Sequence, residues 1–94
     1  MKMILCVTKD EVAGEAVSVI SQYKNEALAK RSWGASIANI MQSGNPDKVP
    51  VQDLKIYKIG EFDTETLTIT PCNEFIASGA EFAILSANNT PKEG

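Results

Sequence analysis

The sequence predicts a small α+β domain, in which an antiparallel sheet of four or five strands is covered on one face by one main helix. Short apolar runs rich in β-branched residues occur before residue 24 and after residue 53, as is typical of strands. Between them, one longer segment repeats apolar residues every three or four positions, which indicates an amphipathic helix. A chain of 94 residues has the length of one domain.

The first two elements are predicted to be strands. Met3–Thr8 is a continuous apolar run of strand length, and charged residues follow it from Lys9. Residues 16–23 alternate with a period of two, which places Val17 and Val19 on one face. We expect these two segments to pair as a hairpin.

The helix is predicted over Asn25–Ser43. Asn25 is a suitable N-cap, and Gly44 ends the periodic pattern. The apolar stripe of this helix consists of Ala29, Trp33, Ile37, Ile40 and Met41. Gly34 is expected to permit close packing against the sheet beside Trp33.

A second hairpin is predicted after a proline-containing loop. Leu54–Phe62 has the composition of a strand, with a bulge expected at Gly60. Residues 63–66 are predicted to form the turn, and Leu67–Thr70 the return strand, which Pro71 is expected to end. The sheet residues expected beneath the helix are Ile4, Val17, Val19, Ile56 and Ile69.

The end of the chain has a weaker pattern. Glu74–Phe82 is expected to form a helical turn broken at Gly79, followed by a short strand over residues 83–85. The side chains expected on the core here are Phe75, Ile76 and Phe82. We expect one domain over residues 1–87 and a flexible polar tail over 88–94.

The composition argues against catalytic and metal sites. The chain has no histidine, and Cys6 and Cys72 lie in separate apolar stretches, so both are expected in the core rather than in a zinc site or a disulfide. Phosphate-binding glycine loops, nucleophile motifs and paired catalytic carboxylates are absent from the sequence. We therefore expect no catalytic residues, metal or cofactor, and a protein that acts by binding.

The location is predicted from the apolar runs. No stretch approaches the ~20 apolar residues of a membrane span. Charged residues from Lys9 onward interrupt the first apolar run before it reaches the length of a secretion signal. We expect no membrane association and a location in the cytoplasm.

Charge is distributed unevenly along the chain. The formal net charge is −3, with six basic and five acidic residues up to position 48, and three basic and seven acidic residues after it. This acidic balance argues against a protein that coats DNA through a large basic surface. It still permits a local basic patch.

Basic residues gather at the predicted helix start. Lys24, Lys30 and Arg31 are candidates for contacts with nucleic-acid phosphates, because lysine and arginine supply most contacts to the DNA backbone. The simpler interpretation is a solvated helix face, and the sequence leaves both open.

Tyr57 is the candidate for base stacking. In the predicted strand it shares a face with Lys55, opposite Leu54 and Ile56, and single-strand binders combine such aromatic residues with basic ones. Core packing is the alternative for Tyr57, whereas Trp33 is expected in the core.

Self-association is predicted from the sheet edges. Strand 16–23 carries no charge, and an unprotected edge strand readily pairs with another chain. We therefore expect a homodimer formed through an edge or through the uncovered sheet face.

Several motifs of the second half occur together. They are Ile56–Asp63 (IYKIGEFD), Thr70–Cys72 (TPC) and Ile76–Phe82 (IASGAEF). In this combination the chain resembles a small nonstructural protein of gokushovirus-type microviruses, which are tailless single-stranded DNA phages. Met1–Val7 and Asn25–Ser32 are also similar to that family.

The resemblance implies a non-enzymatic accessory protein in the host cytoplasm, associated with single-stranded DNA synthesis or packaging. Its implied partner is single-stranded DNA. The alternative is a module that binds the replication initiator, the procapsid or a host factor without touching DNA, which the acidic second half favours. The motif residues Gly60, Glu61, Phe62 and Asp63 are expected to set hairpin geometry.

Overall fold

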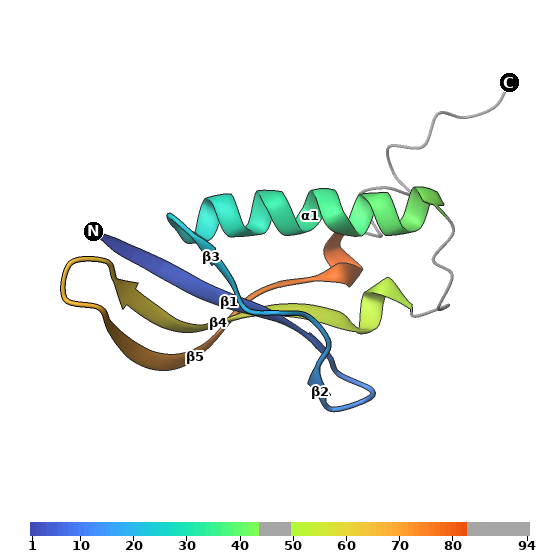
Figure 1. Ribbon diagram of the computed structural model, residues 1–94. Helices are drawn as coiled ribbons and strands as arrows, with labels where there is room; N and C mark the ends of the chain where they lie inside the picture. The colour runs from blue at the N-terminus through green and yellow to red at the C-terminus, as the bar shows by residue number, and fades with distance from the viewer. Residues whose placement is uncertain (44–49, 83–94) are drawn as a thin grey trace, which may run out of the picture.

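The computed structural model describes residues 1–43 and 50–82. In this part of the chain a five-stranded antiparallel sheet carries one long helix on one face (Figure 1). The strand order is β2-β1-β4-β5, and β3 pairs with β1 on the same side as β2. The predicted α+β fold class is confirmed.

Three long strands form the body of the sheet. They are β1 (Lys2–Asp10), β4 (Leu54–Asp63) and β5 (Thr68–Ser78). β1 and β4 pair from Lys2 opposite Asp63 to Asp10 opposite Leu54. β5 continues through Pro71, so the prediction that this proline ends the strand was wrong. β5 is the edge strand, where a residue without an N–H group can be accommodated.

The bulge predicted at Gly60 is present. Two consecutive residues of β1 lie opposite Gly60 and Lys58, so Ile59 has no partner there, and the pairing with β5 also shifts between Lys58 and Gly60. A Cβ atom on Gly60 would lie 3.0 Å from the Thr70 carbonyl oxygen. The close approach of β5 therefore favours glycine at this position.

The first edge of the sheet is broken into two short strands. They are β2 (Glu15–Ala16) and β3 (Ser21–Tyr23). The prediction of one strand over 16–23 was wrong, because the four residues 17–20 lie opposite only two residues of β1. In this stretch Val17 N–H donates to the Thr8 carbonyl (2.9 Å), and Ser18 Oγ accepts from Thr8 N–H (2.9 Å). A serine side chain thus replaces one ladder bond.

The helix α1 (Glu26–Ser43) begins as predicted. The Asn25 side chain accepts a hydrogen bond from Leu28 N–H (2.8 Å), which is the geometry of an N-cap. Its apolar stripe faces the sheet, with Ala29, Trp33 and Ile37 buried. Trp33 Nε1 donates to Thr8 Oγ1 of β1 at 2.9 Å, so the indole N–H is paired.

The core lies between α1 and one face of the sheet. Its buried members are Ile4, Cys6, Ala29, Trp33, Ile37, Val51, Leu54, Ile56 and Ala77. Val17, Val19 and Ile69 were expected there, but they are 55%, 80% and 60% exposed. The two valines lie in the stretch that departs from the ladder. Ile69 lies near the β4–β5 turn, which extends past the start of α1 (Figure 1).

The segment after β4 differs from its prediction. Residues 74–78 belong to β5, and only residues 79–82 are helical, so the helical turn expected from Glu74 starts at Gly79 instead. Phe75 is 54% exposed and not in the core, because it alternates onto the other face of the sheet. Ile76 and Phe82 pack partly against the core, as expected. The predicted strand at 83–85 and tail at 88–94 lie outside the described residues.

Two glycines allow close contacts below α1. A Cβ atom on Gly34 would lie 2.5 Å from Phe82 Cε1. Gly34 therefore makes room for the Phe82 ring, whereas close packing against the sheet was expected. That ring packs edge-on against Trp33 (centroids 5.7 Å, 73°). A Cβ on Gly79 would lie 1.8 Å from the carbonyl oxygen of Val51, in the short 3-10 helix η1 (Val51–Asp53). Both contacts fix residues 79–82 beneath the helix.

Candidate functional site

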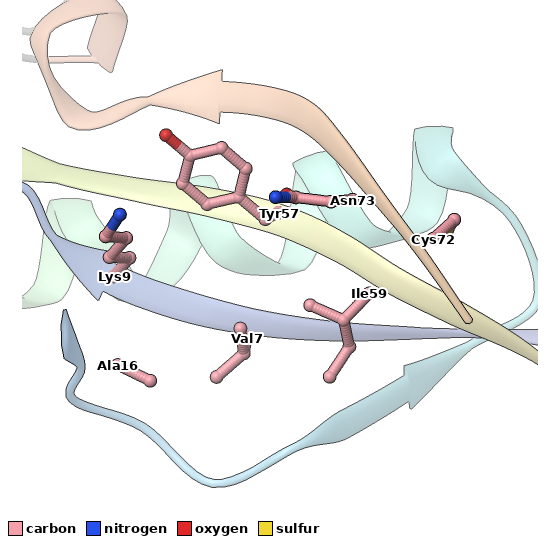
Figure 2. A pocket seen from close by; sticks show the side chains of 7 residues that line it. All are labelled: Val7, Lys9, Ala16, Tyr57, Ile59, Cys72 and Asn73. Atoms are coloured by element: carbon pink, nitrogen blue, oxygen red, sulfur yellow. The ribbon is translucent and has the colours of Figure 1, made fainter.

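The face of the sheet opposite α1 carries the candidate site. Side chains alternate between the two faces of a strand, so Val7, Lys9 and Tyr57 point away from the helix-covered residues such as Ile56. Figure 2 shows these three side chains in front of the sheet with α1 behind it. No helix described in residues 1–43 or 50–82 covers this face.

Two aromatic side chains lie next to each other on this uncovered face. Tyr57 and Phe75 are opposite each other in the β4–β5 pair, and their rings meet edge to face (centroids 6.0 Å, 71°). Edge-to-face pairs are favourable, but here the Phe75 side chain remains 54% exposed. The pair therefore presents aromatic surface to solvent.

A lysine accompanies each ring. Lys9 Nζ lies 6.0 Å from the centroid of Tyr57, and Lys55 Nζ lies 6.0 Å from that of Phe75. Lys9 and Lys55 are also directly opposite each other in the β1–β4 register. Like charges in that position destabilise a sheet. We name these four residues, Lys9, Lys55, Tyr57 and Phe75, the aromatic–lysine cluster.

Glu11 holds the tyrosine of the cluster in place. The Tyr57 hydroxyl donates a hydrogen bond to the Glu11 carboxylate, which also lies 4.0 Å from Lys9 Nζ. This hydrogen bond, and to a lesser extent desolvation, raise the pKa of Tyr57, so the phenol stays protonated. The Tyr57 ring is thereby held beside the Lys9 ammonium and the Glu11 carboxylate.

A hollow of about 380 Å³ lies beside the cluster (Figure 2). Its lining residues are Val7, Lys9, Ala16, Tyr57, Ile59, Cys72 and Asn73. β1, β2, β4 and β5 all contribute to it, and the bulge leaves Ile59 on its surface. Polar and apolar groups line the hollow in about equal measure, and Lys9 is the one cation among the lining residues.

A sequence model of the phage ORF5 protein family matches residues 3–82 of this chain. The chain belongs to the phage ORF5 family. It is therefore a bacteriophage protein, as the sequence resemblance predicted, while the narrower gokushovirus assignment stays a prediction. Neither the curated proteins nor the solved structures contain a match. The matched region of this ORF5 family member includes the whole uncovered face.

The binding residues predicted for this ORF5 family member lie on different sides of the sheet. Tyr57 belongs to the aromatic–lysine cluster. Lys24, Lys30 and Arg31 are exposed at the start of α1, on the helix side, so the structure does not bring them to Tyr57. Their role in binding stays a prediction.

Sequence reasoning identified only Tyr57 of the cluster as a candidate binding residue, and it placed Lys55 on the same strand face without a role of its own. Lys9 was expected to follow the first strand, whereas it lies within β1, and its position opposite Lys55 depends on the β1–β4 register. Phe75 was assigned to the core because residues 74–82 were read as helical. Recognising that β5 continues beyond Pro71 would have placed Phe75 beside Tyr57.

The motif Gly60–Asp63 shapes the hairpin. Gly60 occupies the bulge, and Phe62 lies opposite Met3 and Ile69. The Asp63 carboxylate accepts hydrogen bonds from the N–H groups of Glu65 (2.9 Å) and Thr66 (3.3 Å), which lowers its pKa. These contacts close the turn between β4 and β5.

Glu61 of the same motif joins an ion-pair group at the bulge. Lys58 Nζ lies 3.2 Å from the Glu61 carboxylate and 3.4 Å from that of Glu74 on β5. The hydrogen bond to Glu61 is the main reason that the pKa of Lys58 is raised. This lysine is therefore held by two carboxylates, whereas Lys9 has one carboxylate neighbour, Glu11, at 4.0 Å.

No group of three or more His, Cys, Asp or Glu side chains placed to hold a metal ion occurs in residues 1–43 and 50–82. No helix in that part of the chain is long and apolar enough to cross a membrane.

Proposed function

We propose that this phage protein binds single-stranded DNA on the uncovered sheet face, through the aromatic–lysine cluster. The observation that carries the proposal is the exposed Phe75, packed edge-on against Tyr57, with a lysine 6.0 Å from each ring. Proteins that bind single strands combine aromatic side chains, on which bases stack, with cations that contact the backbone. Both parts occur here on one open surface.

The placement of the two lysines supports an anionic ligand. Lys9 and Lys55 are opposite each other on adjacent strands, where their charges repel. A phosphate group between or beside them would remove this repulsion and release counterions. The unpaired bases of a single strand, unlike those of a duplex, are free to stack on Phe75 and Tyr57 at the same time.

The biological role of the proposed DNA binding is inferred from the family to which the chain belongs. The protein comes from a phage, and the motifs Ile56–Asp63 and Ile76–Phe82 resemble a nonstructural protein of gokushovirus-type microviruses. We infer a non-enzymatic accessory role in the synthesis or packaging of a single-stranded genome. The site of action would be the cytoplasm of the infected host.

Fluorescence anisotropy with a labelled single-stranded oligonucleotide, at low and moderate salt, tests the proposal. The Lys9→Ala/Lys55→Ala and Lys30→Ala/Arg31→Ala variants are a matched pair, because each removes two positive charges. We expect the first variant to weaken binding and to reduce the log–log salt slope by about 1.4, since each phosphate contact contributes about 0.7 for single strands. The second variant should bind like the wild type.

Phe75→Ala separates stacking from charge. Its expected effect is a roughly ten-fold weaker affinity with an unchanged salt slope, because base stacking on an aromatic residue contributes about 1–3 kcal/mol. Circular dichroism checks that each variant is folded. Absence of binding by the wild type at low salt would contradict the proposal. Weakening confined to the Lys30/Arg31 variant would instead assign DNA contact to the helix start.

A second candidate function is protein–protein interaction, and the edge formed by residues 17–20 favours it. Val17, Val19 and Ile20 are 55%, 80% and 60% exposed. Large exposed apolar side chains close together are typical of interfaces. We propose that this edge forms a homodimer, and that the same edge binds phage replication or procapsid proteins if DNA binding is absent.

Light scattering at micromolar concentrations tests the homodimer. The wild type is expected to have twice the mass of the chain, and Val19→Lys is expected to give the monomer mass. Thr70→Lys, an exposed substitution on the opposite edge, is the control and should leave the dimer intact. A monomeric wild type would refute the dimer.

A further inference from the structure

We infer that the hollow beside Tyr57 is a subsite for one nucleobase of the bound strand, with the Asn73 amide contacting the edge of that base. This inference rests on the proposed single-stranded DNA binding and assigns a specific pocket to it. Its starting point is the position of the hollow, which shares Tyr57 and Lys9 with the aromatic–lysine cluster.

The hollow is large enough to hold a base. A volume of about 380 Å³ is near the lower end of the range of about 300–1,000 Å³ found for small-molecule sites. Val7 and Ile59 supply apolar surface, and the Tyr57 ring supplies an aromatic wall (Figure 2). A flat heteroaromatic ligand can make contact with all three.

The lining is chemically suited to a neutral ligand rather than to a phosphate. Lys9 is the one cation among its lining residues, and the Glu11 carboxylate lies 4.0 Å from that lysine. Desolvation is the main reason that the pKa of Cys72 is raised, so its thiol is uncharged at neutral pH. A base would occupy the hollow while the adjoining phosphate meets Lys9 at its rim.

Asn73 provides the polar contact. Its side chain extends from β5 across β4 toward Tyr57 (Figure 2). In the described part of the chain its amide has no hydrogen-bond partner. An amide offers one acceptor and two donors, so it can pair with adjacent donor and acceptor atoms on a base edge. Proteins that recognise single-stranded RNA by sequence read unstacked bases through such pairing.

The test compares oligonucleotides that differ only in their bases. Anisotropy is measured with oligo-dA, oligo-dC and oligo-dT, and with a strand of abasic sites that keeps the phosphates. Asn73→Ala removes the amide, and Ala16→Phe fills the hollow from the exposed strand β2. Gln22→Ala is the matched control, because Gln22 is an exposed amide on β3 outside the hollow.

We expect the wild type to distinguish the three homopolymers and to bind the abasic strand most weakly. Asn73→Ala and Ala16→Phe should each weaken binding to the preferred homopolymer about ten-fold. Their salt slopes should not change, because no phosphate contact is lost. Gln22→Ala should behave as the wild type. In NMR spectra, the side-chain amide signals of Asn73 should shift with the preferred strand and not with the abasic strand.

Two results would overturn the inference, and they differ from each other. Binding that is equal for all homopolymers and insensitive to Asn73→Ala and Ala16→Phe would remove the subsite and leave the proposed DNA binding intact. Absence of wild-type binding to every strand would remove both.

Discussion

The two faces of the sheet are built from the same strands but differ in what their side chains do. On the face under α1, Cys6 and Ile56 are 1% and 2% exposed, and they pack on the helix stripe. On the other face, Val7 and Tyr57, one position along each strand, are only half-buried. Because alternate residues of β1 and β4 lie on different faces, a substitution can change the covered core or the uncovered face without changing the other.

The largest effect is expected from Gly79→Ala, at the contact that closes the covered face. The new Cβ would lie 1.8 Å from the Val51 carbonyl oxygen, and neither backbone can move without displacing η1 or residues 79–82. We expect a loss of at least about 3 kcal/mol in the free energy of unfolding, measured by urea denaturation. Gly14→Ala is the control. Its Cβ meets no atom within 4 Å, so only the positive φ of +76° is strained, at about 1–2 kcal/mol.

Ile56→Ala and Ile59→Ala make the same change on the two faces of one strand. Ile56 is buried under α1, so its truncation should lower the free energy of unfolding by about 3 kcal/mol. Ile59 is half-buried on the uncovered face, and about 1 kcal/mol is expected. Equal losses in urea denaturation would show that the uncovered face contributes to stability as much as the core does.

The thiol of Cys6, on the covered face, is expected to make the free energy of unfolding depend on pH. Burial, with a smaller contribution from the charge of Glu26, raises the pKa of Cys6 from 9.0 to about 11. The unfolded state therefore loses this proton first, and stability falls as pH rises from about 9 to about 11. We expect the difference in unfolding free energy between the wild type and Cys6→Ala to shrink over that range. A constant difference would contradict the prediction.

The smallest effect is expected at the β4–β5 turn, which belongs to neither face. Leu67 has a φ of +60° and is 73% exposed, so it carries backbone strain without burying its side chain. Leu67→Gly should raise the free energy of unfolding by about 0.5–1 kcal/mol, after the greater chain entropy of glycine is subtracted. Thermal denaturation measures the gain. A decrease in the melting temperature would indicate that the leucine makes contacts in solution that offset the strain.

The features predicted well from sequence were those set by local patterns. The N-cap at Asn25, the buried stripe Ala29–Trp33–Ile37 and the bulge at Gly60 all depend on short-range spacing or on one residue type. The fold class followed because these elements leave few ways to bury one helix face against two hairpins.

The features predicted wrongly were those decided by tertiary register. The edge residues 17–20 alternate like a strand, but two extra residues relative to β1 force them off the ladder. Pro71 normally ends a strand, and only its place on an edge allows β5 to continue. The aromatic–lysine cluster depends on that continuation, so only Tyr57 of its four members was identified as a binding residue.

The central position of β1 has a consequence for the order in which the protein assembles during translation. β1 pairs with β2 and β3 on one side and with β4 on the other. β2 and β3 follow β1 closely in the chain, but β4 (Leu54–Asp63) is synthesised only after all of α1. Until then the apolar stripe of α1 lacks the core residues of β4 and β5, such as Ile56 and Ala77. Closing that long loop is entropically costly, and the nascent chain therefore completes its core only when the second hairpin has left the ribosome.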